Sequence, residues 1–155
     1  MRAATLIPVL FITLAGALPA AATGTLDCVA DDASAQVDVH GVVPYGMGAP
    51  LLQVQAEIAS ELPGVGTDLG NAVFGTEHRV QYWLDDVSLN VLFYWERPGN
   101  GPFGSTTLVI KTTRNKGDEE GTYLGGYDIE GYEVPAGGGE PNIVHARGQI
   151  ECFAG

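Results

Sequence analysis

Two cysteines, Cys28 and Cys152, carry the most specific chemistry in this chain of 155 residues. Each lies in a run of the same form, in which an apolar residue, an acid, the cysteine, an apolar residue and an alanine follow one another. In a strand this places each cysteine on an apolar face with a carboxylate as its sequence neighbour. Burial and negative charge both disfavour a reactive thiolate, and the three scattered histidines supply no further zinc ligands. The pair therefore predicts a structural disulfide.

Hydroxyl nucleophiles are the second kind of reactive group to consider. The candidates are the serines at 34, 60, 88 and 105, and none of them stands in a G-x-S-x-G elbow. The sequence also has no H-E-x-x-H pair, phosphate-binding loop or dinucleotide fingerprint. We therefore expect a protein without enzymatic activity and without a cofactor.

Acidic loops are the candidates for a metal, because calcium prefers carboxylate oxygens. The segment "ADDAS" holds Asp31 and Asp32, and the segment "KGDEEG" holds Asp118, Glu119 and Glu120. Neither segment has the spacing of an EF-hand, and both are typical of turns kept soluble by charge. We predict no metal site and retain these five carboxylates as the ligands that calcium would use.

Aromatic side chains offer a non-covalent binding surface. Alternation places Trp83, Leu92 and Tyr94 on the face of a predicted hairpin opposite its apolar set. The glycine-rich segment "TYLGGYDIEGY" adds Tyr123, Tyr127 and Tyr132. An outward aromatic patch surrounded by carboxylates suits a protein or glycan ligand. In the alternative interpretation a loop, or the segment 51–62, covers these rings.

The elements that must position these residues are short and alternating. Clusters rich in glycine and proline punctuate the chain at 44–50, 63–70, 98–104 and 135–141. Between them apolar and polar residues alternate with a period of two, which is typical of strands with one buried face. Segment 51–62 fits both a strand, which we favour, and a short helix. About seven to eight such strands predict an all-β domain, an antiparallel β-sandwich or closed barrel.

One hairpin can be predicted with a register. If Asp85 and Asp86 form the turn, six apolar residues fall on one face in three pairs: Leu84 with Val87, Tyr82 with Leu89, and Val80 with Val91. Asp-Asp is a poor two-residue turn, so we expect a four-residue loop in the same register.

Residues 1–22 have the form of a secretory signal peptide, with Arg2, an apolar stretch and a small-residue cleavage pattern. The apolar stretch is short and interrupted by prolines, so we expect no membrane insertion after signal removal. We predict an exported domain, residues 23–155, located in the periplasm or secreted. Disulfides persist in either location.

The charge of the chain constrains its partners. Its 7 basic and 19 acidic residues give a net charge of −12. Removal of the signal peptide, which holds one arginine and no acid, makes the charge more negative still. Such a field repels nucleic acid and anionic lipid and speeds encounter with a cationic partner.

Three functions fit these features. The first is a non-catalytic exported domain that binds a protein or glycan of unknown identity through its aromatic and acidic surface. The second is an inhibitor of a cationic exported enzyme such as a lysozyme, which the charge suggests. The third is a structural subunit of a surface assembly, suggested by the glycine-rich segment 121–134 and by edge strands.

Overall fold

The structure is a computed structural model that describes residues 23–44, 51–117 and 121–155. The predicted signal peptide and the candidate ligands Asp118, Glu119 and Glu120 lie outside these ranges. The described chain forms nine strands with two short helical turns, in the order β1 (Thr23–Asp31), β2 (Ala35–Pro44), β3 (Leu52–Ser60), α1 (Thr67–Gly70), β4 (Val73–Phe74), η1 (Thr76–His78), β5 (Arg79–Leu84), β6 (Ser88–Glu96), β7 (Gly104–Arg114), β8 (Thr122–Glu133) and β9 (Asn142–Ala154).

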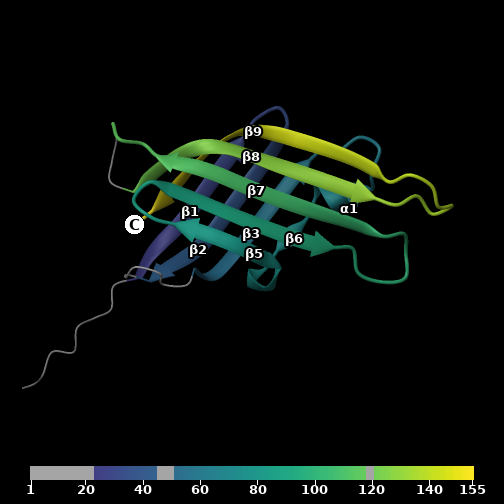
Figure 1. The fold of residues 1–155 in the computed structure, drawn as a ribbon, viewed down its shortest axis with the longest axis horizontal. Helices are drawn as coiled ribbons and strands as arrows, with labels where there is room; N and C mark the ends of the chain where they lie inside the picture. The colour runs from purple at the N-terminus through teal and green to yellow at the C-terminus, as the bar shows by residue number, and fades with distance from the viewer. Residues whose placement is uncertain (1–22, 45–50, 118–120) are drawn as a thin grey trace, which may run out of the picture.

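All nine strands belong to one antiparallel sheet in the order β4-β3-β2-β1-β9-β8-β7-β6-β5. The sheet folds over on itself into two layers whose strands cross, with β5–β9 in front and β1–β3 behind (Figure 1). Pairing of β1 with β9 joins the two layers, and the sheet remains open between its edge strands β4 and β5. The predicted all-β sandwich or barrel is therefore confirmed as a nearly closed sheet.

The core lies between the two layers and is built from the alternating apolar positions of the strands. Its largest fully buried side chains are Phe74, Phe93, Leu26, Leu69, Leu89, Leu108, Ile110 and Ile129. The rings of Phe74 and Phe93 lie 5.5 Å apart across the open side of the sheet, so aromatic packing helps to close it where no strand ladder does.

The predicted disulfide is present. Cys28 and Cys152 stand directly opposite each other on β1 and β9, with their Cα atoms 4.0 Å apart and a bond between their sulfur atoms. Both residues are fully buried, as their place in apolar runs predicts. The ladder between these two strands has four residue pairs and is extended by two backbone hydrogen bonds between Thr25 and Gly155, so the bond reinforces a short ladder that holds the layers together.

Segment 51–62 forms β3, which confirms the favoured prediction over the helical alternative. The side chains of Val54, Ala56 and Ile58 point into the core and alternate with exposed polar residues. The α-helix nearby, α1, has four residues. None of the helices in the described ranges has the length and apolar character needed to span a bilayer.

The predicted hairpin register is wrong by two residues. Leu84 pairs with Leu89, and Tyr82 pairs with Val91, so residues 85–88 form the loop. The carboxylate of Asp85 accepts hydrogen bonds from the backbone N–H groups of Val87 and Ser88, at 2.8 and 2.7 Å, and so closes a loop of four residues.

A shift of two preserves the faces of the strand, because side chains alternate with the same period. Tyr82, Leu84 and Leu89 therefore still face the core. Val87 and Val80 do not: Val87 lies in the loop, Val80 lies at a bulge between Arg79 and Gln81, and both are exposed.

Candidate binding surface

Trp83 is the large aromatic residue most open to solvent in the described chain. Its side chain projects from the outer face of β5 and remains 59% exposed. The indole Nε1 donates a hydrogen bond to Oδ2 of Asp85, at 2.9 Å, which fixes the orientation of the ring. This bond, followed by the backbone N–H groups of Ser88 and Val87, holds the pKa of the Asp85 carboxyl below its usual value. The ring is thus both exposed and held in one orientation.

A shallow hollow of about 340 Å³ lies beside Trp83 on the outer face of β5, β6 and β7. Its floor includes Leu92, which is directly opposite Val109 on the neighbouring strand. Asn90 and Lys111, another directly opposed pair, supply polar groups beside the indole. The hollow therefore combines one aromatic ring, an apolar floor and side chains that donate hydrogen bonds.

Tyr94 and Tyr132 lie farther along the same outer face. Tyr94 is half-buried, and its hydroxyl donates to Oε1 of Glu96 at 2.7 Å. Burial, followed by this bond, raises the pKa of Tyr94 above its usual value. Tyr132 packs edge to face with Phe103, with ring centroids 5.8 Å apart, and stands opposite Ile143. Neither Tyr94 nor the Tyr132–Phe103 pair lines the hollow.

Tyr123 and Tyr127 do not belong to the surface, contrary to the sequence prediction. Their side chains are only 5% and 3% exposed, because they share the inner face of β8 with Ile129. The hydroxyl of Tyr127 donates to Oδ1 of Asp32 at 2.8 Å. Burial, followed by this bond, raises the pKa of Tyr127 to about 12. A side chain at Gly148 would collide with this ring, which explains the glycine opposite it.

A charged cluster borders the hollow on β8 and β9. Asp128 stands opposite Val109 and accepts hydrogen bonds from His145 Nδ1 at 2.8 Å and from Arg147 Nε at 2.7 Å. Burial raises the pKa of Asp128, but the bonds from His145 and Arg147 outweigh it and leave that pKa below its usual value. The cluster gives the hollow an ionised rim on one side.

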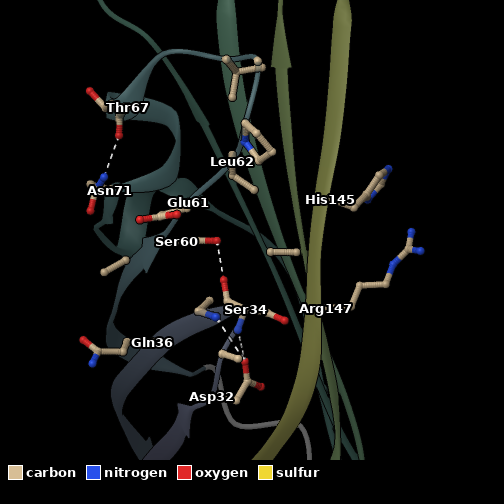
Figure 2. A pocket seen from close by; sticks show the side chains of 17 residues that line it. Asp32, Ser34, Gln36, Ser60, Glu61, Leu62, Thr67, Asn71, His145 and Arg147 are labelled. Carbon is tan, nitrogen blue, oxygen red and sulfur yellow. Dashed lines mark hydrogen bonds between the residues drawn. The ribbon is translucent and has the colours of Figure 1, made fainter.

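A larger recess, about 1090 Å³, opens where β9 separates from the turn between β1 and β2 (Figure 2). Three of its polar lining residues, Asp32, Ser60 and Asn71, already make hydrogen bonds to the loops that surround it. Ser60 Oγ donates to the backbone carbonyl of Ser34 at 2.7 Å. His145 and Arg147 lie on the opposite side of β9 from Ser34 and Asp32 (Figure 2). The recess therefore shows neither a nucleophile paired with a base nor a cluster of groups converging on a ligand.

The acids retained as candidate calcium ligands have structural partners where they are described. Asp32 caps the turn after β1, because its Oδ1 accepts the backbone N–H groups of Ser34 and Ala35 at 2.7 and 3.2 Å. The N–H of Ser34, followed by the Tyr127 hydroxyl, lowers the pKa of Asp32. Asp31 accepts a hydrogen bond from the side chain of Gln36. Within the described ranges no three histidine, cysteine or acidic side chains are grouped as metal ligands would be.

The structure thus brings together two of the six predicted surface residues, Trp83 and Leu92, at one hollow. Sequence reasoning missed the contributions of Val109, Lys111 and Asn90. Alternation alone places Val109 and Lys111 on an outer face, but the register that sets them beside Leu92 and Asn90 is a long-range pairing.

Comparison with known protein families, with curated proteins and with solved structures finds no match to this chain.

Proposed function

We propose that this protein is an exported, non-catalytic binding domain that holds a protein or glycan ligand against the outer face of β5, β6 and β7. The observation that carries the proposal is the exposed indole of Trp83 beside an apolar hollow. Tryptophan is the side chain most often responsible for binding energy when it is exposed at a surface and buried by a ligand. Its hydrogen bond to Asp85 reduces the entropy that binding would otherwise cost.

The groups around the indole support either ligand class. A glycan ring would stack on the indole while Asn90, Gln81 and Lys111 hydrogen-bond its hydroxyls. A protein would bury the same ring together with Leu92 and Val109. In both cases the binding energy depends on the indole, so one substitution tests both.

The test is affinity capture with the oxidised protein, using envelope extract and culture medium as the source of ligand. Trp83→Ala is expected to lose the captured ligand, because it removes the aromatic surface of the hollow. Phe153→Ala is the matched control, since Phe153 is also an exposed aromatic but lies on β9. Equal capture by wild type and Trp83→Ala would refute the proposal. A large fall in the thermal midpoint of Trp83→Ala would show that the ring belongs to the core.

A further inference from the structure

The two layers of the sheet differ in charge. Residues 23–78, within which β1–β4 and the helical turns lie, contain eight acidic residues and no lysine or arginine. Every basic residue after residue 22 lies between Arg79 and Arg147. The back layer is therefore strongly acidic, whereas the front layer carries charges of both signs.

Acids in the two layers also differ in their partners. On the front layer Asp128 pairs with Arg147, and Glu133 pairs with Arg97. On the outer face of β1, β2 and β3, His40 is the ion-pair partner of two acids. It contacts Asp27 at 2.8 Å and Asp38 at 3.5 Å. On this face Asp31 and Glu57 thus have no cationic side chain beside them among the described residues.

A row of directly opposed residues crosses this face from strand to strand. We call it the acidic–apolar row, and its members are, in order, Val73, Glu57, Asp38, Val29, Glu151 and Leu124. Carboxylates at Asp38 and Glu57 face each other across β2 and β3, although like charges in that position destabilise a sheet. The apolar side chains of the row are open to solvent, with Val29 51% and Val73 62% exposed.

We infer that the acidic–apolar row is a docking surface for a basic polypeptide, whose lysine or arginine side chains lie along the row. Such side chains bury aliphatic stems on apolar surface while their charged ends reach outward. Stems would cover Val29 and Val73, and the charged ends would meet Asp38, Glu57 and Glu151. This complementarity excludes anionic lipid and nucleic acid, which the same carboxylates repel. The surface is separate from the hollow at Trp83, because residues of β5, β6 and β7 line the hollow and the row crosses the other six strands of the sheet.

The test uses a short synthetic peptide in which lysine alternates with leucine, and a second peptide in which serine replaces each leucine. Each is titrated into isotopically labelled protein while amide signals are recorded at fixed ionic strength. We expect saturable binding of the lysine–leucine peptide, with shifts concentrated on the outer residues of β1, β2 and β3. The lysine–serine peptide is expected to bind more weakly, because it offers no apolar contact for the valines.

Variants separate the row from the overall charge. Asp38→Asn combined with Glu57→Gln is expected to weaken binding about fivefold, the effect of losing two exposed ion pairs. The control, Asp86→Asn combined with Glu140→Gln, removes the same charge from exposed loops of the front layer and is expected to change affinity little. Val29→Thr keeps the β-branched shape. It is expected to weaken binding of the lysine–leucine peptide and to leave binding of the lysine–serine peptide unchanged.

Three results would overturn the inference. The first is an absence of saturable binding. The second is a set of amide shifts centred on β5, β6 and β7, which would assign basic peptides to the hollow instead. The third is equal weakening by the control pair and the row pair, which would show that only the net charge attracts the peptide.

Discussion

Replacing both cysteines by valine, Cys28→Val with Cys152→Val, removes the covalent link between β1 and β9. The change places an apolar, β-branched pair, which suits a strand, at the same position of the ladder. The link closes a loop with a sequence separation of 124 residues. The chain-entropy relation gives a stabilisation of about 5 kcal/mol for a loop of that length, through the unfolded state. Because small domains are stable by about 5–15 kcal/mol, the variant should be close to the limit of folding.

The assay is equilibrium unfolding in urea, followed by near-ultraviolet circular dichroism, on the oxidised wild type and the double variant. We expect a loss of about 5 kcal/mol in the free energy of unfolding. Wild type under reducing conditions serves as the control and should match the variant, because both lack the link. A loss below about 1 kcal/mol, within the range of an ordinary substitution, would refute the view that the bond holds the two layers together.

Two further substitutions test internal hydrogen bonds. Tyr127→Phe should destabilise the protein at neutral pH, because it removes the hydroxyl that helps to depress the pKa of Asp32. A depressed carboxyl pKa stabilises the fold fully above the unfolded value, about 3.9, and this contribution is lost as the pH falls through the folded value. The thermal midpoints of wild type and Tyr127→Phe should therefore converge as the pH falls into the acid range. A difference that stays constant with pH would contradict the role of the hydroxyl in lowering the pKa of Asp32. Thr106→Val should cost about 1 kcal/mol in urea unfolding, because buried Thr106 donates to the carbonyl of Leu69 at 2.8 Å. An unchanged midpoint would show that this bond does not hold α1 to β7.

Local pattern was sufficient to predict the strands and the disulfide. The matching runs around Cys28 and Cys152 indicate that both side chains lie on an inner face. A disulfide between them then requires the two strands to lie close together, as they do. Alternation of Val54, Ala56 and Ile58 likewise predicts β3 over a helix. These features depend on a period of two, which the sequence displays directly.

Loop length and long-range register could not be predicted in the same way. A shift of two residues in the hairpin leaves every face unchanged, so alternation cannot detect that Leu84 pairs with Leu89 and not with Val87. The deciding contact is the Asp85 carboxylate, which accepts backbone hydrogen bonds and makes a four-residue loop. The local sequence shows an acid at that position but does not indicate which hydrogen bonds it makes.

In the candidate site, too, alternation within a strand could be predicted and pairing between strands could not. Alternation along β5 predicts Trp83 on an outer face, and the structure agrees. The prediction that Tyr123 and Tyr127 lie on the surface is wrong, because both share alternation with Ile129, which marks the inner face of β8. The spacing of these three residues by even numbers is visible in the sequence and is sufficient to predict that they share a face. The pairing of Leu92 with Val109, which forms the floor of the hollow, cannot be predicted from the sequence in this way, because it joins separate strands.

The most direct measurement of the central proposal follows the fluorescence of Trp83 in a Trp95→Phe variant, which has a single tryptophan. Acrylamide, a neutral quencher that the acidic surface does not repel, should quench this residue readily in the free protein, because its side chain is 59% exposed. Saturation with the captured ligand is expected to shield the indole, lowering the quenching constant and shifting emission to shorter wavelength. Unchanged quenching at saturating ligand would show that the ligand binds elsewhere and that the hollow beside Trp83 is not the binding site.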